Sequence, residues 1–267
     1  MSFLRRSFVV AGLATALVAC APGGKAADPN RLVVAATAVP HAEILEFVKP
    51  RLAEDGVNLE IRVFNDYVQP NLVVDQRLAD AYYFQTGPYL EDFNRTRGTK
   101  LQIVAGVHVE PFGAYSRRWK SIAETPQGAV VAIPNDPSTI GRALILLHRS
   151  GLITLRNPAN AMSTLKDITA NPKNVTFREL EAPQLPRVLD QVDLALINTN
   201  YALDANLNPT RDALAIESKD SPYVNFLVAR QDNANDPRIL KLAAALRSPE
   251  VRAFIEEKYK GAVVPAF

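Results

Sequence analysis

The chain has 267 residues, of which 48% are hydrophobic and 22% are charged, and its 30 basic residues nearly balance its 28 acidic ones. This length suffices for one large domain or two lobes, and the charge balance excludes the basic stripe typical of nucleic-acid-binding proteins. The single cysteine excludes an internal disulfide, so packing alone must hold the fold.

The N-terminus has the pattern of an export signal that ends at a cysteine. Arg5 and Arg6 precede an apolar run from Phe8 to Val18, which is shorter than the roughly 20 residues of a membrane span. Small residues then lead to Cys20, as in a bacterial lipobox. We expect removal of residues 1–19, acylation of Cys20 and a flexible tether at residues 20–30. Export by the Sec or the twin-arginine route stays open, because the two arginines resemble a twin-arginine address only weakly.

Strands and helices are expected to alternate from Arg31 onward. A buried strand at 32–36 is followed by a helix over 41–55, which Pro50 should kink or interrupt and Gly56 should end. The next expected elements are a strand at 59–63, a helix at 70–78, a strand at 81–84, a helix opened by Pro88 and a strand at 101–107.

The second half continues the same alternation. Strands are expected at 112–115, 130–133, 175–179, 194–197 and 226–228, with a helix that carries Ile140, Ala143, Leu144 and Leu147. Ser248 should cap the last helix, which Pro249 begins. The pattern predicts an α/β protein with mostly parallel sheets.

Two polar segments follow strands at the edge where open α/β sheets bind ligands. The segment 134–142 combines a rigid turn with a helix start, where free N–H groups and the helix dipole favour an anion. Arg142 would add a bidentate contact to a carboxylate there, or it is an ordinary surface arginine. Asn198 follows the strand 194–197, and its amide would suit an amino acid backbone or would cap the next helix.

Aromatic residues gather in the segments 64–67 and 82–89. They would form the wall of a pocket for an apolar side chain, or they belong to the core. No phosphate loop, nucleophile elbow or zinc-protease motif occurs, and His41, His108 and His148 are scattered and are interpreted as structural. We therefore expect no catalytic residue, no metal site and no cofactor.

Several segments together resemble the methionine-binding lipoprotein (NlpA/MetQ) family, the substrate-binding components of amino-acid ABC importers. The similarity runs from about Leu32 to Phe267. The segments that carry it are Thr37–Leu45, Phe64–Asn71, Phe84–Gln85 with Pro88–Leu90, Pro134–Pro137 with Gly141–Arg142, Leu180–Arg187, Ile197–Thr199 and Ser221–Asn225.

The resemblance implies a two-lobed, type II-like periplasmic-binding-protein fold that closes on one amino acid. Residues 30–112 and 229–267 would form one lobe and 113–228 the other, with hinge crossovers near 112–116 and 223–228. It further implies a monomeric lipoprotein, membrane-anchored on the periplasmic side of the cell envelope, that delivers its ligand to a permease and ATPase complex.

The resemblance also assigns roles to individual residues. Arg142 would pair with the ligand carboxylate, Asn198 and Asn225 would hold the amino acid backbone, and the side-chain pocket would be lined by Tyr67, Phe84 and Tyr89. Where the family has Asp-Ala-Asn-Ala-Phe-Gln-His, this chain has Asp80-Ala81-Tyr82-Tyr83-Phe84-Gln85-Thr86.

Strict alternation would turn Tyr82, Phe84 and Thr86 to one side of this strand and Tyr83 and Gln85 to the other. Thr86 would then stand where the family has an imidazole that faces the side chain of the ligand. A neighbouring tyrosine would refill the volume, and the preference for the ligand's side chain would change. Methionine or a related apolar amino acid is the expected ligand. A methionine-containing dipeptide, or a non-transport envelope lipoprotein with an altered pocket, is the alternative; an enzyme would need an acid–base pair that Asp66, Glu43 and His41 do not form in any recognised motif.

Overall fold

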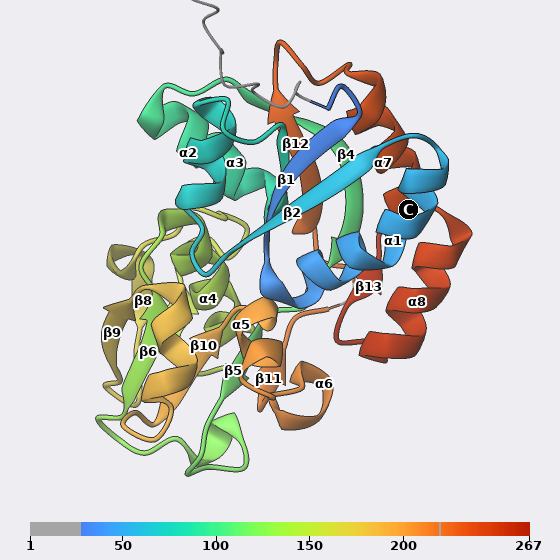
Figure 1. Cartoon of the computed structure of the whole chain (residues 1–267). Helices are drawn as coiled ribbons and strands as arrows, with labels where there is room; N and C mark the ends of the chain where they lie inside the picture. Colours follow the sequence, from blue (N-terminus) through green and yellow to red (C-terminus); the bar gives the residue numbers. More distant parts are fainter. Residues whose placement is uncertain (1–27, 219) are drawn as a thin grey trace, which may run out of the picture.

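The computed structural model describes residues 28–218 and 220–267, so the predicted signal, Cys20 and most of the predicted tether lie outside the described residues. The described chain forms two lobes, each built around its own β-sheet (Figure 1). We call the lobe with the six-stranded sheet the first lobe, and the lobe with the five-stranded sheet the second.

The first lobe contains both ends of the described chain. Its sheet has the order β13-β4-β12-β3-β1-β2, with strands β1 (Arg31–Thr37), β2 (Asn58–Phe64), β3 (Ala81–Thr86), β4 (Leu101–Val109), β12 (Val224–Arg230) and β13 (Val264–Pro265). Its helices are the turn η1 (Ala38–Ala42), α1 (Glu43–Glu54), α2 (Gln69–Asp75), α3 (Gly87–Arg97), α7 (Pro237–Leu246) and α8 (Pro249–Tyr259).

The second lobe is one continuous insertion between β4 and β12. Its sheet has the order β11-β5-β10-β6-β9, with strands β5 (Gly113–Tyr115), β6 (Val130–Pro134), β9 (Thr176–Leu180), β10 (Leu194–Ile197) and β11 (Ala215–Ile216). Its helices are η2 (Ile122–Glu124), α4 (Pro137–Arg149), η3 (Leu165–Asp167), η4 (Ala182–Val188), α5 (Thr199–Asp204) and α6 (Pro209–Asp212), and β7 (Thr154–Leu155) pairs with β8 (Ile168–Ala170).

Both sheets are mixed, which corrects the expectation of mostly parallel pairing. The pairs β1–β2, β1–β3, β10–β6 and β6–β9 are parallel. The strands on either side of the lobe crossings run the other way: β12 is antiparallel to β3 and β4, and β5 is antiparallel to β10 and β11. Because β12 returns from the second lobe into the first, it enters its sheet opposite to the strands of the βαβ units.

The two crossings lie between β4 and β5 and between β11 and β12. The whole of Val224–Arg230 pairs within the first sheet, so the return crossing lies before Val224 and not at the expected segment 223–228. The assignment of residues 224–228 to the second lobe is therefore wrong. The apolar strand signal at 226–228 belongs to a central strand of the first lobe, which the chain enters as soon as it leaves the second.

Each sheet is buried on both faces. In the first lobe, Leu45, Leu52 and Leu242 belong to one core, on the α1 and α7 side, while Val74 and Leu90 belong to a second core under α2 and α3. Helix α1 continues through Pro50 to Glu54, so the predicted interruption is absent. Its buried residues on both sides of the proline keep it in contact with this core.

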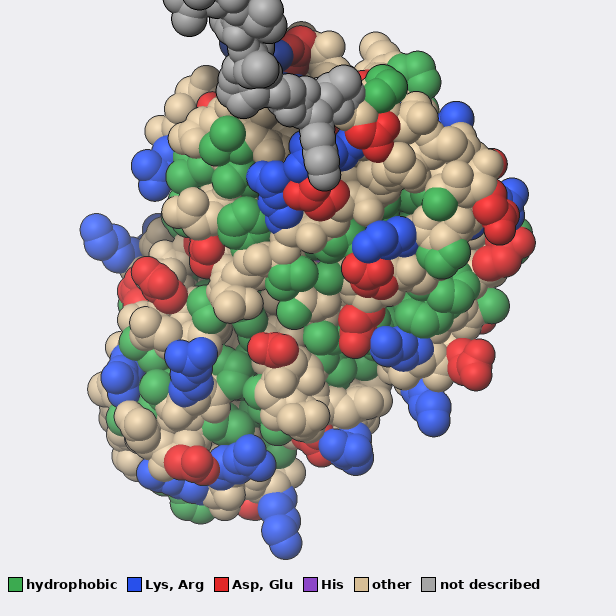
Figure 2. Space-filling view, viewed as in Figure 1, with side chains coloured by type: hydrophobic (Ala, Val, Ile, Leu, Met, Phe, Trp, Pro, Cys, Tyr) green, Lys and Arg blue, Asp and Glu red, His purple; other side chains and the backbone are tan. Residues whose placement is uncertain are grey.

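Among the described residues, no helix is both long and apolar enough to cross a membrane. On the face shown in Figure 2, basic and acidic side chains are interspersed over both lobes. This face therefore carries no extended field of one sign.

Candidate functional site

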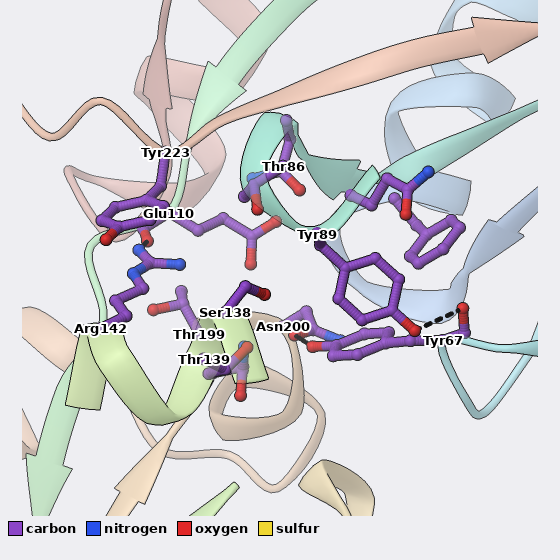
Figure 3. A pocket seen from close by; sticks show the side chains of 14 residues that line it. Tyr67, Thr86, Tyr89, Glu110, Ser138, Thr139, Arg142, Thr199, Asn200 and Tyr223 are labelled. Carbon is purple, nitrogen blue, oxygen red and sulfur yellow. Dashed lines mark hydrogen bonds between the residues drawn. The ribbon is translucent and has the colours of Figure 1, made fainter. Parts of the chain in front are cut away.

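A pocket of about 490 Å³ lies between the two lobes and is lined by residues from both lobes and both crossings (Figure 3). Its lining residues are Tyr67, Phe84, Gln85, Thr86, Tyr89, Glu110, Ser138, Thr139, Arg142, Asn198, Thr199, Asn200, Tyr223 and Asn225. All seven residues that the sequence analysis selected as ligand contacts are among them. Residues up to 158 positions apart in the sequence thus meet in one place.

Arg142 projects from α4 and is buried, with 6% of its surface exposed. Its Nε and Nη2 atoms donate to the two carboxylate oxygens of Glu217 at 2.9 and 2.6 Å, and Nη2 also donates to the carbonyl of Glu110 at 2.7 Å. The guanidinium lies 4.3 Å from the ring centre of Tyr223 and 5.1 Å from that of Phe112. Burial opposes the charge, but the Glu217 carboxylate outweighs it and raises the pKa of Arg142.

This arrangement changes the expected role of Arg142. The bidentate carboxylate contact is made inside the protein, with Glu217, because a buried guanidinium needs a paired charge. Among the described residues Nη1 has no hydrogen-bond partner, and a guanidinium nitrogen points into the pocket in Figure 3. A ligand carboxylate can therefore be bound through Nη1 but not through the Nε edge.

The predicted anion site at the start of α4 is occupied by a side chain of the protein itself. The side chain of Asp136 caps this helix and accepts from the backbone N–H and the hydroxyl of Thr139, at 2.9 and 2.7 Å. Ser138 donates to the same oxygen at 2.9 Å. The protein's own carboxylate therefore occupies the N-terminal site of the helix.

Asn198 follows β10 and stands at the N-cap position of α5, but its side chain makes no capping hydrogen bond. Only 9% of the residue is exposed, and its buried Oδ1 has no hydrogen-bond partner in the part of the chain that the structure describes. A buried acceptor without a donor is costly, by about 1–3 kcal/mol. The helix-cap interpretation of Asn198 is therefore wrong, and its side chain lies at the pocket, where a ligand role stays a prediction.

The aromatic residues form the other end of the pocket. The ring of Tyr67 lies 5.6 Å from that of Phe84, 5.8 Å from that of Tyr89 and 5.1 Å from that of Tyr201. The Tyr67 hydroxyl donates to Asn200 Oδ1 at 2.6 Å, and the Tyr89 hydroxyl donates to the Tyr67 carbonyl at 3.1 Å. The apolar ring faces thus remain for the ligand while the hydroxyls are bound by the protein.

A β-bulge in β3 changes the expected directions of its side chains. Gln85 pairs with Phe226 and Tyr83 with Leu227, so Phe84 is the extra residue. As a result Gln85 hydrogen-bonds to Tyr82 and Asn71, on the side opposite to that expected from strict alternation. Neither Tyr82 nor Tyr83 lines the pocket, so neither refills the volume beside Thr86.

Thr86 and Asn225 are register partners on β3 and β12. Thr86 makes no side-chain capping bond at the start of α3, and its hydroxyl faces the pocket without a partner among the described residues. Asn225 is buried, and its Oδ1 lies 3.1 Å from His41 Nε2.

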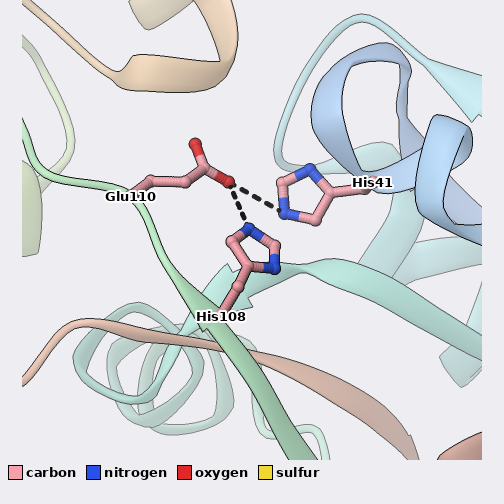
Figure 4. Close-up of side chains that lie close together, drawn as sticks. All are labelled: His41, His108 and Glu110. Atoms are coloured by element: carbon pink, nitrogen blue, oxygen red, sulfur yellow. Dashed lines mark hydrogen bonds and ion pairs between the residues drawn. The ribbon is translucent and has the colours of Figure 1, made fainter. Parts of the chain in front are cut away.

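His41 and His108, which are far apart in the sequence, meet at the carboxylate of Glu110 (Figure 4). Glu110 Oε1 lies 2.8 Å from His108 Nε2 and 3.2 Å from His41 Nε2. Burial lowers the pKa of His41 to about 4 and that of His108 to about 3, and it raises the pKa of Glu110 against the opposing effects of His41, Arg142 and the Asn200 N–H.

Seven lining residues were not selected from the sequence: Gln85, Glu110, Ser138, Thr139, Thr199, Asn200 and Tyr223. Most lie inside segments that had been singled out. Glu110 does not, although it comes directly after the carboxyl end of β4, and the rule that ligands bind beyond strand ends would have found it.

Comparison with known proteins agrees with this architecture. The model of the NlpA lipoprotein family matches residues 32–267. The D-methionine-binding lipoprotein MetQ of Escherichia coli strain K12 is 40% identical over 271 residues, which cover 99% of each chain.

Two solved structures are also similar to this chain. The structure of a nutrient binding protein from Burkholderia cenocepacia bound to methionine is 44% identical, with a TM-score of 0.86 and coverage of 88% of this chain and 100% of that chain. An ABC transporter periplasmic substrate-binding protein from Coxiella burnetii is 39% identical, with a TM-score of 0.84 and the same coverage. The two-lobed binding-protein fold is therefore confirmed, and the chain belongs to the NlpA lipoprotein family.

Proposed function

We propose that this chain is a lipid-anchored receptor that captures a free α-amino acid, methionine or a close apolar relative, and delivers it to an ABC importer. The names of its relatives support this ligand class: one is a D-methionine-binding lipoprotein and one was solved with methionine bound. Delivery to an ABC importer is supported by the similarity of this chain to the ABC transporter substrate-binding protein from Coxiella burnetii.

The observation that carries the proposal is a pair of complementary, unpartnered groups in one buried pocket. Within residues 28–218 and 220–267, Arg142 Nη1 offers donors that no acceptor binds, and Asn198 Oδ1 is a buried acceptor to which no group donates. Glu110 contributes a second acceptor, since the contacts of its carboxylate to the two histidines go through Oε1 alone. An α-amino acid carries a carboxylate for the arginine and an ammonium group for the two acceptors.

The aromatic end of the pocket suits the side chain of such a ligand. Tyr67, Phe84 and Tyr89 present ring faces, and a thioether sulfur near aromatic rings gains about 0.3–1.5 kcal/mol. A charged side chain would meet no ionised partner among these three residues, and burying it would be costly. The pocket therefore favours an apolar side chain.

Two hydrogen bonds join the lobes beside the pocket. Tyr67 donates to Asn200 at 2.6 Å, and the Tyr201 hydroxyl donates to the Asn65 carbonyl at 3.2 Å. With only two chain crossings between the lobes, opening at these contacts would admit the ligand and closing would desolvate it. The pocket has lining residues from both lobes of one chain, and we propose a monomer as the binding unit.

We propose binding without catalysis, because the acidic residues considered for acid–base chemistry have other partners. Asp66 accepts from the backbone N–H groups of Val68 and Gln69, and Glu43 contacts Tyr259 and Lys258. The anchor at Cys20 would hold the receptor at the periplasmic side of the membrane beside its permease and ATPase partners. A Cys20→Ser variant should then appear in the soluble fraction rather than with membranes.

Calorimetric titration of protein freed from co-purified ligand tests the proposal. We expect D- or L-methionine to bind with 1:1 stoichiometry and lysine or aspartate not to bind measurably. Binding of a methionine-containing dipeptide but of no free amino acid would change the ligand class, and no binding of either would favour a non-transport envelope lipoprotein.

A further inference from the structure

The buried cluster of His41, His108 and Glu110 lies behind the pocket, and the proposed ligand contacts leave its two histidines without a role (Figure 4). His41 comes from the turn η1, His108 from β4 and Glu110 from the crossing into the second lobe. Both rings are at most 1% exposed. Three elements thus bring together groups that each need a defined hydrogen-bond partner.

The partners of each ring determine which of its nitrogens carries the proton. Nδ1 of His41 lies 2.7 Å from the Thr37 hydroxyl, and Nδ1 of His108 contacts the Tyr83 hydroxyl. Nε2 of both rings faces Glu110 Oε1, which can only accept when ionised. The arrangement in which every contact is a hydrogen bond has the proton on Nε2 and a hydroxyl donating to Nδ1 in both histidines.

These tautomers have two consequences in the pocket. Two N–H groups bind Glu110 Oε1, which favours the ionised carboxylate and leaves Oε2 for the pocket, toward which the carboxylate points in Figure 3. His41 Nε2–H also faces Asn225 Oδ1 at 3.1 Å, so the Asn225 amide must turn its Nδ2 donors away from His41. The two neutral histidines thereby orient one acceptor, Glu110 Oε2, and one donor, Asn225 Nδ2, toward the ligand.

We propose that His41 and His108 are positioning residues that make this pocket selective for ligands with a free, cationic α-amino group. This inference rests on the proposed function and names its chemical requirement. The ammonium group would lie between Glu110 Oε2 and Asn198 Oδ1, while Arg142 and Asn225 bind the carboxylate. A ligand without the amine would leave the ionised Glu110 desolvated, with neutral N–H donors but no cation bound to its carboxylate, which is costly.

The same side chains could also bind a transition metal, since two histidines and a carboxylate form a common zinc set. Their ligand atoms lie within 4.8 Å of one another, however, and Glu110 Oε1 is only 2.8 Å from His108 Nε2 and 3.2 Å from His41 Nε2. Bonds of about 2.0–2.1 Å around a tetrahedral Zn²⁺ would bring the ligands to about 3.4 Å. The hydrogen-bonded arrangement fits the observed spacing better, and metal binding becomes an outcome of the test.

The test compares methionine with its analogue 4-(methylthio)butanoic acid, which lacks only the amino group. For the wild-type protein we expect the analogue to bind about 100-fold more weakly or worse. His108→Leu should weaken methionine binding roughly 10- to 100-fold while changing analogue binding less than about threefold, because only the ammonium contact depends on the orientation of Glu110. His108→Gln, whose amide N–H can replace Nε2–H, should restore most of the preference.

The outcomes separate the possible failures. If the wild-type protein binds neither compound, the proposed function fails. If it binds methionine but His108→Leu keeps the full preference, the positioning role fails. Nitrogen-15 NMR of the wild-type histidines needs no variant: Nε2–H tautomers in both rings support the proposal and Nδ1–H tautomers overturn it. A 1:1 Zn²⁺ titration that depends on His108 and changes methionine affinity would also overturn it.

Discussion

The buried pair of Arg142 and Glu217 makes a prediction in which stability and ligand binding separate. Arg142→Ala leaves the Glu217 carboxylate buried and unpaired, because both of its contacts to the guanidinium are lost. Breaking a buried pair in this way costs about 3–5 kcal/mol in the free energy of unfolding. The same variant loses a charge-assisted hydrogen bond to the ligand, worth about 1.5–3 kcal/mol, so affinity should fall roughly 10- to 150-fold.

A second variant distinguishes the two effects. In Arg142→Ala/Glu217→Gln no charge is left unpaired, so we expect about half or more of the lost stability to return while methionine binding stays weak. Urea unfolding gives the free energies, and calorimetry of the folded variants gives the affinities. Near-native methionine affinity in the double variant would refute the assignment of Arg142 as the carboxylate anchor. Unchanged stability in Arg142→Ala would refute the account of the pair.

The remaining predictions concern the unpartnered and titrating groups. Asn198→Ala should lower methionine affinity about tenfold without loss of stability in urea, because its Oδ1 has no partner and caps nothing; a clear loss of stability would contradict this. Thr86→His should raise methionine affinity severalfold by calorimetry while Thr86→Val leaves it unchanged, and no rise with histidine would reject the specificity role of this position. The pKa values of His41 and His108 are lowered in the folded protein, so the unfolded chain binds protons more readily below its pKa of about 6.5. The free energy of unfolding should therefore be highest above pH about 6.5 and should fall by about a few kcal/mol as the pH falls toward about 4. The raised pKa of Glu110 partly offsets this fall. Unfolding experiments from pH 7 to pH 4 should show this fall, and a flat profile would show that the rings are not buried as neutral groups.

Much of the secondary structure could be predicted from local sequence patterns. The strand 32–36, the helix capped by Ser248 and the strand 194–197 all occur close to their expected bounds, because each is specified by its own periodicity and end signals. Pairing direction was not predictable in this way. It depends on where β12 re-enters the first sheet, and an apolar strand has the same composition in either direction.

The site residues, too, divide into those that local patterns predict and those that depend on contacts between distant segments. Arg142 and Asn198 were found because they follow strands, and the resemblance added Asn225. Glu217, the partner of Arg142 within the protein, was not predicted. It lies 75 positions away, and nothing in its own segment indicates that it contacts an arginine. The bulge at Phe84 was missed for a similar reason: it is set by the register with β12 and not by the residues of β3.

The central claim is that one amino acid zwitterion satisfies the unpartnered groups of this pocket. A crystal structure of the protein with methionine tests it most directly. The account predicts the carboxylate on Arg142 Nη1, the ammonium group between Asn198 Oδ1 and Glu110 Oε2, and the thioether against Tyr67, Phe84 and Tyr89. Methionine bound in the reverse direction, with its ammonium group away from Asn198 and Glu110, would contradict it.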